Sequence, residues 1–272
     1  MASATPLRVD AEVVSLADEG GVNHRLVLSV PGWPGSSPGQ FVMLSAGVRT
    51  GVERSDPLLP RPMAVYRQQQ AGGGTRVEIL FKVHGRGTAL LACARPGEKV
   101  RVVGPLGRGF PLGEEGEAPI LVAGGTGIAS VYELAAALAQ AGRPARVLLG
   151  ARSADDLMAE ADFAALPGAL RVATEDGSRG ERGLVTDLLA AALAEAPNPR
   201  VYACGPTPMM RATADLTAAA GVPCIVSLEN PMACGFGVCL GCAAPLRAGG
   251  FALVCRDGPV FDAARVDWEG LP

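Results

Sequence analysis

The sequence predicts an α+β chain of three units: a six-stranded antiparallel barrel, a doubly wound α/β domain and a small cysteine-rich C-terminal domain. Three observations support this prediction. The N-terminal part holds short β-rich runs, the middle alternates apolar runs with Ala/Leu-rich stretches, and the end is rich in Gly and Cys. The length of 272 residues is enough for two domains of about 100 to 150 residues each, and the cysteine-rich end follows as a short third unit. We expect these units at residues 1–112, 113–228 and 229–272.

The N-terminal unit is predicted to be a barrel because clear turn chemistry separates its β-rich runs. Pro31–Gly35 and Ala71–Gly74 are breaks of this kind. A brief helix is expected over Thr88–Ala94. Six short strands with turns between them are typical of a small antiparallel barrel. The expected strands are Leu7–Ser15, Arg25–Val30, Gln40–Leu44, Pro62–Tyr66, Arg76–Val83 and Lys99–Val103.

The pattern changes after the linker-like segment Gly113–Glu117. Strands are expected over Ile120–Ala123, Arg146–Gly150, Leu170–Thr174, Arg200–Ala203 and Pro223–Ser227. Helices are expected over Ala129–Ala141, Ala154–Ala165, Leu184–Ala194 and Met209–Ala220. Alternating strands and helices of this kind imply a parallel sheet with helices on both faces.

Composition excludes several classes of function. The net charge is −3, aromatic residues make up 4% of the chain, and no basic run occurs, so neither nucleic acid nor an anionic membrane is an expected partner. Gly, Pro or charged residues interrupt each apolar run before the roughly 20 residues that a membrane span needs. Met1–Asp10 lacks the layout of a secretory signal. We therefore expect a cytoplasmic protein.

Four of the seven cysteines follow the spacing C-x4-C-x2-C…C, which is typical of plant-type [2Fe–2S] ligation. Neighbouring glycines would let the loop wrap around a cluster and direct backbone N–H groups at its sulfur atoms. Structural zinc is the alternative, but zinc sites usually use two separated C-x2–4-C pairs. The predicted cluster ligands are Cys234, Cys239, Cys242 and Cys255.

The other three cysteines, Cys93, Cys204 and Cys224, are scattered along the chain. Unpaired cysteines of this kind commonly pack as small hydrophobic residues. We expect all three to be buried.

A second set of motifs indicates a flavin in the barrel unit. Arg61 begins an apolar strand, where its charge can neutralise a pyrophosphate, and Pro62 fixes the backbone there. Thr88 at the expected helix start would leave free N–H groups for a phosphate. The glycine-rich turn Gly104–Phe110 permits close approach of a ligand. An iron–sulfur cluster also needs an electron source, so these motifs together favour a bound flavin.

A third set indicates a pyridine nucleotide. The turn Gly124, Gly125, Thr126 and Gly127 follows an expected strand and opens a helix, although it departs from the strict G-x-G-x-x-G pattern. Cys204, Gly205 and Pro206 follow a later strand, at the edge where an open α/β sheet binds its ligand. Two tight turns without a ligand are the alternative. The chain has only two histidines and no evident acid–base pair, so we expect it to carry electrons rather than to convert an organic substrate.

The order of these motifs resembles the ferredoxin–NADP reductase superfamily over most of the chain. The tail, Glu229–Cys242 with Val254–Phe261, is similar to the electron-transfer subunits of dihydroorotate dehydrogenase B. The resemblance implies an oxidoreductase subunit that carries FAD and a [2Fe–2S] cluster, uses NAD as co-substrate, and pairs with an FMN-containing catalytic subunit in an α2β2 heterotetramer. Electrons would pass from dihydroorotate through FMN, the cluster and FAD to NAD, in pyrimidine (UMP) biosynthesis.

The same resemblance assigns FAD contacts to Arg61, Pro62, Met63, Ala64, Leu80, Phe81, Lys82, Gly87 and Thr88. Two positions depart from the family pattern, since Ala64 stands where Ser or Thr is usual and Ser130 where Pro is usual. Three alternatives stay open: a sister subunit serving a hydrogenase, a sulfite reductase or a bifurcating transhydrogenase, a stand-alone ferredoxin reductase, and a zinc-stabilised binding module without enzymatic activity.

Overall fold

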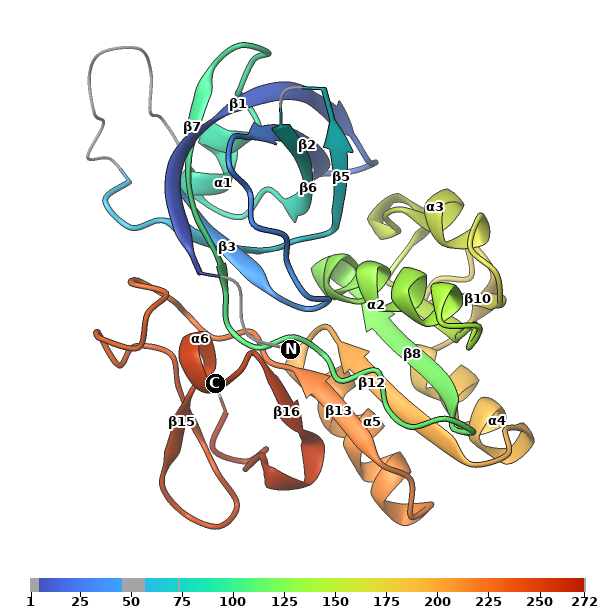
Figure 1. Cartoon of the computed structure of the whole chain (residues 1–272). Helices are drawn as coiled ribbons and strands as arrows, with labels where there is room; N and C mark the ends of the chain where they lie inside the picture. Colours follow the sequence, from blue (N-terminus) through green and yellow to red (C-terminus); the bar gives the residue numbers. More distant parts are fainter. Residues whose placement is uncertain (1–4, 46–56, 73, 272) are drawn as a thin grey trace.

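The computed structural model describes residues 5–45, 57–72 and 74–271. Its N-terminal part is a strongly curved, barrel-like sheet of antiparallel strands in the order β4-β3-β7-β1-β2-β6-β5 (Figure 1). A short helix, α1 (Arg86–Leu91), follows β6. The strands are β1 (Leu7–Asp18), β2 (Asn23–Val30), β3 (Phe41–Ser45), β4 (Arg61–Ala64), β5 (Arg67–Ala71), β6 (Gly74–Lys82) and β7 (Lys99–Leu106).

Among the described residues this sheet has seven strands, where the sequence predicted six. The expected strand Pro62–Tyr66 does not continue as one element, because the chain changes its pairing partner within it. Ala64 pairs with Phe41 of β3, whereas Arg67 pairs with Glu78 of β6. The intervening Val65 and Tyr66 are buried. The predicted strand therefore corresponds to β4 and a buried corner, and β5, which follows it, was not predicted.

The second sheet is parallel except at one edge, in the order β11-β10-β9-β8-β12-β13-β16. At that edge β16 pairs antiparallel with β13. Its strands are β8 (Ala118–Gly124), β9 (Arg146–Ala151), β10 (Ala169–Thr174), β11 (Glu181–Arg182), β12 (Pro199–Cys204), β13 (Cys224–Ser227) and β16 (Val260–Asp262).

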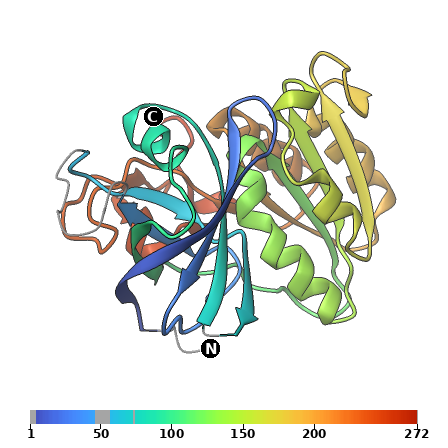
Figure 2. The same ribbon diagram turned by 90° about the horizontal axis from the view of Figure 1, so that it is seen from above.

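Helices cover both faces of this sheet, as the alternating pattern predicted. Ile120 and Val122 of β8 pack with helices α4 (Val185–Glu195) and α5 (Thr207–Ala219). The intervening residues of β8 point to the opposite face, since side chains alternate along a strand. There they pack with α2 (Ile128–Gln140) and α3 (Glu160–Ala164), which Figures 1 and 2 place on the side of the barrel.

The predicted helix Ala154–Ala165 is wrong as a single element. A short 3₁₀ helix, η2 (Ala154–Asp156), and α3 replace it. Ala159 between them has a left-handed backbone, with φ of 58°. A regular helix cannot pass through that conformation. The break turns α3 toward the barrel.

The C-terminal segment adds a hairpin, β14 (Ala243–Pro245) and β15 (Phe251–Leu253), and a helical turn, α6 (Val254–Asp257). It then returns to the second sheet as β16, followed by the 3₁₀ helix η3 (Ala263–Arg265). Its buried residues, Val266 and Trp268 among them, share one hydrophobic core with α4 and α5. The segment thus obtains from its neighbour the core that it is too short to form alone.

The scattered cysteines only partly follow the prediction. Cys204 and Cys224 are buried, but Cys93 is exposed just beyond α1, so its predicted burial is wrong. Within the described ranges, no helix combines the length and the apolar character needed to cross a membrane.

A charged network joins the barrel to α3. The guanidinium of Arg25 on β2 lies 2.6 Å from the Asp162 carboxylate and 3.3 Å from that of Glu78. The Tyr66 hydroxyl donates a hydrogen bond of 2.6 Å to Asp162. Burial raises the pKa of Asp162, but the hydrogen bond from Tyr66 and the ion pair with Arg25 outweigh burial and lower that pKa overall. The ionised carboxylate therefore stabilises the contact between the two units.

We expect Asp162→Asn to lower the free energy of unfolding at pH 7 by about 2 kcal/mol, the usual range for hydrogen bonds to charged groups. Because the folded-state pKa is lowered, this contribution is complete above the unfolded value of about 3.9 and is lost as pH falls through the folded value. Urea unfolding at pH 7 and at pH 3 measures both effects, and the variant should lose less stability on acidification. Asp10→Asn, which removes half of an exposed pair with Arg101, should cost less than about 0.5 kcal/mol. Equal losses in the two variants would contradict the prediction.

Candidate functional site

Two cavities of similar size meet where the barrel faces the carboxyl edge of the parallel sheet. The sheet-edge cavity, of about 540 Å³, lies over the ends of β8, β9, β10 and β12. The barrel cavity, of about 510 Å³, lies between β4, β6 and the start of α2. Lys82, Thr126 and Glu229 line both. A ligand in one cavity can therefore touch a ligand in the other at these residues.

The barrel cavity collects the predicted flavin residues. Arg61, Pro62, Met63, Ala64, Leu80, Phe81, Lys82 and Thr88 all line it. Gly87 does not, but it packs directly against Arg61, since a Cβ at Gly87 would lie 2.5 Å from the Arg61 Nε atom. Among the described residues Arg61 forms no ion pair, and its guanidinium donates to the Leu59 carbonyl at 3.0 Å. The arrangement fits an anionic ligand with a large apolar part, as FAD is.

Thr88 differs from the prediction in its local role. Helix α1 begins at Arg86, and Gly85 with φ of 81° precedes it. The Thr88 hydroxyl accepts a hydrogen bond from the His84 N–H at 2.7 Å and donates to the Gly85 carbonyl at 3.1 Å. Thr88 therefore closes the turn from within the helix and is not its first residue.

The sheet-edge cavity collects part of the predicted nucleotide set. Gly124, Gly125, Thr126 and Pro206 line it, whereas Gly127, Cys204 and Gly205 lie behind its wall. The two turns touch there, because a Cβ at Gly127 would lie 2.3 Å from the Cys204 carbonyl oxygen. Gly125, with φ of 54°, faces open space at the start of the segment that leads into α2. Backbone N–H groups at this point suit a pyrophosphate.

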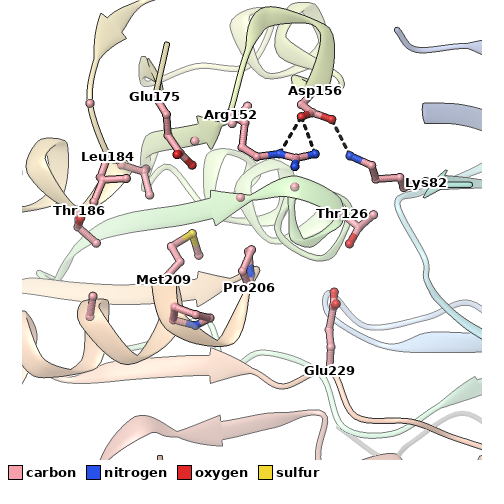
Figure 3. A pocket seen from close by; sticks show the side chains of 18 of the residues that line it. Lys82, Thr126, Arg152, Asp156, Glu175, Leu184, Thr186, Pro206, Met209 and Glu229 are labelled. Atoms are coloured by element: carbon pink, nitrogen blue, oxygen red, sulfur yellow. Dashed lines mark hydrogen bonds and ion pairs between the residues drawn. The ribbon is translucent and has the colours of Figure 1, made fainter. Parts of the chain in front are cut away.

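Charged side chains that were not predicted from the sequence, Arg152 and Asp156, also line the sheet-edge cavity. The Asp156 carboxylate lies 2.6 Å from Lys82 Nζ and 3.1 Å from the Arg152 guanidinium (Figure 3). The hydrogen bond from Lys82 is the main reason that the pKa of Asp156 is lowered, against the opposing effect of burial. Asp156 thus neutralises much of the positive charge in this cavity.

Two carboxylates, Glu175 and Glu229, lie at opposite ends of the same cavity (Figure 3). Neither side chain has a hydrogen-bond or ion-pair partner within the described part of the chain. The protein around Glu229 disfavours its charged form and raises its pKa, although its side chain opens onto the cavity. Both residues closely follow strands of the parallel sheet, and that position was the sequence signal that could have identified them.

The four predicted cluster cysteines lie on the loop between β13 and β14 and at the start of α6. Cys242 and Cys255 have their Sγ atoms 3.2 Å apart. Backbone N–H groups point at the sulfurs, from Gly237 to Cys255 at 3.1 Å and from Phe236 to Cys234 at 3.4 Å. In the described part of the chain no three His, Cys, Asp or Glu side chains converge on a position for one metal ion. The thiols and their N–H donors fit the chemistry of an iron–sulfur cluster.

Local backbone geometry explains how this loop curves. Gly235 and Gly237 have φ near +80°, a conformation that side chains with a Cβ resist. Burial raises the pKa of the Cys234 thiol, but N–H donors from Cys239 and Phe236 outweigh burial and bring that pKa to about 6. The Cys234 thiolate, which is the form that binds metal, is thus favoured near neutral pH.

The cluster loop also touches the barrel. A Cβ at Gly235 would lie 2.8 Å from the Met43 side chain of β3 and 3.0 Å from that of Leu106 on β7. The segment from Ser227 to Met232, which leads into Cys234, forms one wall of the barrel cavity. The cavity and the cysteines are therefore neighbours in the chain as well as in space.

Comparison with known proteins identifies the family. Residues 229–267 match the model for the iron-sulfur cluster binding domain of dihydroorotate dehydrogenase B, and residues 121–215 match that for an oxidoreductase NAD-binding domain. The chain is 37% identical over 235 residues to the dihydroorotate dehydrogenase B (NAD(+)) electron transfer subunit of Desulforamulus reducens, covering 85% of this chain and 87% of the relative. It is 40% identical over 233 residues to the subunit of Bacillus caldolyticus, covering 84% and 86%. The chain belongs to the family of dihydroorotate dehydrogenase B electron transfer subunits.

A solved structure supports this membership at the level of the fold. An NADH-dependent reduced ferredoxin-NADP oxidoreductase, studied for flavin-based electron bifurcation, superposes with a TM-score of 0.84 at 30% identity, covering 96% of this chain and 91% of that one. As an electron transfer subunit of dihydroorotate dehydrogenase B, the chain is an oxidoreductase subunit with FAD, [2Fe–2S] and NAD as its cofactors, and it acts with a catalytic partner.

Proposed function

We propose that this chain passes electrons from a dihydroorotate-oxidising FMN subunit through a [2Fe–2S] cluster on Cys234, Cys239, Cys242 and Cys255 to FAD in the barrel cavity and then to NAD in the sheet-edge cavity. The wall that the two cavities share is the observation that carries this proposal. The segment from Ser227 to Met232 links that wall to the first cysteine and so supports the order of the carriers.

The carriers need this order because of their chemistry. NAD accepts two electrons together as hydride, an iron–sulfur cluster transfers one at a time, and a flavin between them can do both. The chain supplies binding and orientation. Arg61 would pair with the flavin pyrophosphate, and the N–H groups of Gly125 and Thr126 would hold that of NAD. Glu175 would accept hydrogen bonds from the adenosine ribose and repel a 2′-phosphate, which favours NAD over NADP.

Exposed apolar side chains surround the cysteines and suit a protein partner. Phe236, Val238 and Leu240 are 51%, 81% and 63% exposed, all on the loop that holds three of the cluster ligands. Exposed apolar groups gathered at one place commonly mark an interface. A catalytic subunit that docks here would bring its FMN close to the cluster. We extend the proposal to an α2β2 heterotetramer with that subunit.

The proposal also covers the organisation of the chain and its location in the cell. We propose units at residues 1–112, 113–228 and 229–272 for FAD, NAD and the cluster. A reducing cytoplasm is the proposed location, since it keeps the four cysteines available as thiolates.

The test is reconstitution with a dihydroorotate dehydrogenase catalytic subunit. We expect a complex in gel filtration and dihydroorotate-dependent formation of NADH. Val238→Asp places a charge in the proposed interface and should abolish the complex while NADH oxidation by ferricyanide, which needs only FAD, continues. Leu112→Asp, at an exposed apolar position outside the loop, should leave the complex intact. Without a complex or NADH formation from the unaltered chain, the assignment to dihydroorotate fails.

A second candidate is the corresponding subunit of a bifurcating transhydrogenase. The likeness to the NADH-dependent reduced ferredoxin-NADP oxidoreductase, over 96% of this chain, favours it. The two candidates differ in their partner. Stable association with a transhydrogenase large subunit, and none with the dihydroorotate-oxidising one, would select the second.

A further inference from the structure

Glu229 occupies a position that the electron-transfer scheme does not use. It is the only described residue of the C-terminal segment that lines the sheet-edge cavity, and it lines the barrel cavity as well. Figure 3 shows its carboxylate pointing into the sheet-edge cavity, on the side of Thr126 and Lys82. A group in this place lies beside both ligands at the point where they meet.

The surrounding charges leave the Glu229 carboxylate uncompensated. Lys82 shares this end of the cavity, but its ammonium group is 2.6 Å from Asp156. Arg152, the other cation in the lining, lies 3.1 Å from the same carboxylate. Surrounding protein atoms raise the pKa of Glu229, although its side chain opens onto the cavity, and no cation opposes that shift. A cationic ligand group in this part of the cavity would therefore meet an unpaired carboxylate at Glu229.

The nucleotide supplies such a group in only one of its redox states. The nicotinamide ring is positively charged in NAD⁺ and neutral in NADH. Electron exchange with a flavin requires this ring at the end of the sheet-edge cavity that borders the barrel cavity. Glu229 lies at that end, whereas Glu175 lies at the other, where the adenosine would be.

We propose that the Glu229 carboxylate faces the nicotinamide ring and selects the oxidised nucleotide, strengthening the binding of NAD⁺ relative to NADH. This inference rests on the proposed function, since it takes the sheet-edge cavity as the NAD site. Uptake of NAD⁺ and release of NADH would both be favoured. A single charge pair a few ångströms apart at a partly solvated site accounts for an effect of about tenfold.

The test compares two nucleotides that differ in ring charge and do not react with the oxidised holoprotein. These are NAD⁺ and its neutral analogue 1,4,5,6-tetrahydro-NAD, with Kd measured by calorimetry. For Glu229→Gln we expect the Kd of NAD⁺ to rise about tenfold and that of the neutral analogue to change less than about twofold. Flavin and cluster absorbance equal to those of the unaltered protein verify that the variant is folded and loaded.

Glu175→Gln is the matched control, because it removes a carboxylate from the other end of the same cavity. It should change the two Kd values by the same factor, since the adenosine half is identical in both nucleotides. An equal change in both, or no change in either, for Glu229→Gln would overturn the inference alone. Failure of the unaltered holoprotein to bind either nucleotide would overturn the NAD site and, with it, this inference.

Discussion

Cys239→Ser is expected to abolish dihydroorotate-driven formation of NADH by the reconstituted complex, with a loss of at least about 100-fold. Substitution of residues around the ligands of a metal site commonly lowers metal affinity or activity 10- to 100-fold. Cys239 is itself a proposed ligand, so we expect a loss at least this large. Its thiol is exposed, and its backbone N–H donates to Cys234 Sγ at 3.5 Å. The variant should lose the cluster and with it the route from the partner to FAD.

The same variant should still oxidise NADH with ferricyanide, since that reaction uses only the two cavities. Iron and sulfide content, visible absorption and the electron paramagnetic resonance of the reduced protein measure the cluster directly. Cys93→Ser is the matched control, because Cys93 is also exposed but lies outside the loop. If Cys239→Ser retained a full cluster, or if both activities fell together, the assignment of the ligand would be wrong.

The second large effect is expected for Arg61→Ala, which should weaken FAD binding about 100-fold. A charge-assisted hydrogen bond to phosphate contributes about 1.5 to 3 kcal/mol, and each 1.4 kcal/mol corresponds to tenfold in affinity. Gly87→Ala tests the position of the guanidinium while its charge is kept. The added Cβ would lie 2.5 Å from Arg61 Nε, so the flexible side chain must move, and we expect a loss of about tenfold.

Titration of the apoprotein with FAD measures both effects. Arg76→Ala is the control, since it removes an exposed cation from β6 of the same barrel outside the cavity. It should leave the affinity for FAD unchanged. Similar losses for Arg61→Ala and Arg76→Ala would mean that net charge, rather than a specific contact, holds the flavin.

The fold could be predicted wherever local pattern and burial agree. Alternate residues of β8 divide between the two faces of a sheet covered by helices, and the alternating runs indicated this arrangement. The predictions were wrong where a distant partner decides the local structure. Val65 and Tyr66 continue an apolar run, yet the chain leaves β3 there and pairs with β6. The break at Ala159 likewise has no marker, because alanine is a good helix former.

The candidate site divides in the same way. The cysteine spacing, the segment beginning at Arg61 and the turn at Gly124 are continuous motifs, so their residues could be named from the sequence. Glu175 and Glu229 belong to no continuous motif beyond their position after a strand, and only the folded chain places them at the two ends of one cavity. Cys93 was predicted to be buried from the general preference of cysteine for the protein interior, but it is exposed, so this preference did not hold at that position.

The return of the chain as β16 has a consequence for electron tunnelling. The rate of tunnelling falls steeply with the distance between donor and acceptor, so the rate of a relay depends on the spacing of its carriers. Cys242 and Cys255 share one core with Met43 of the barrel and Val226 of the parallel sheet. Since β16 pairs with β13, the segment between these strands, which carries all four cysteines, is held at both its ends by the sheet that carries the nucleotide cavity. Anchoring at both ends limits how far the cysteines can move relative to the nucleotide cavity.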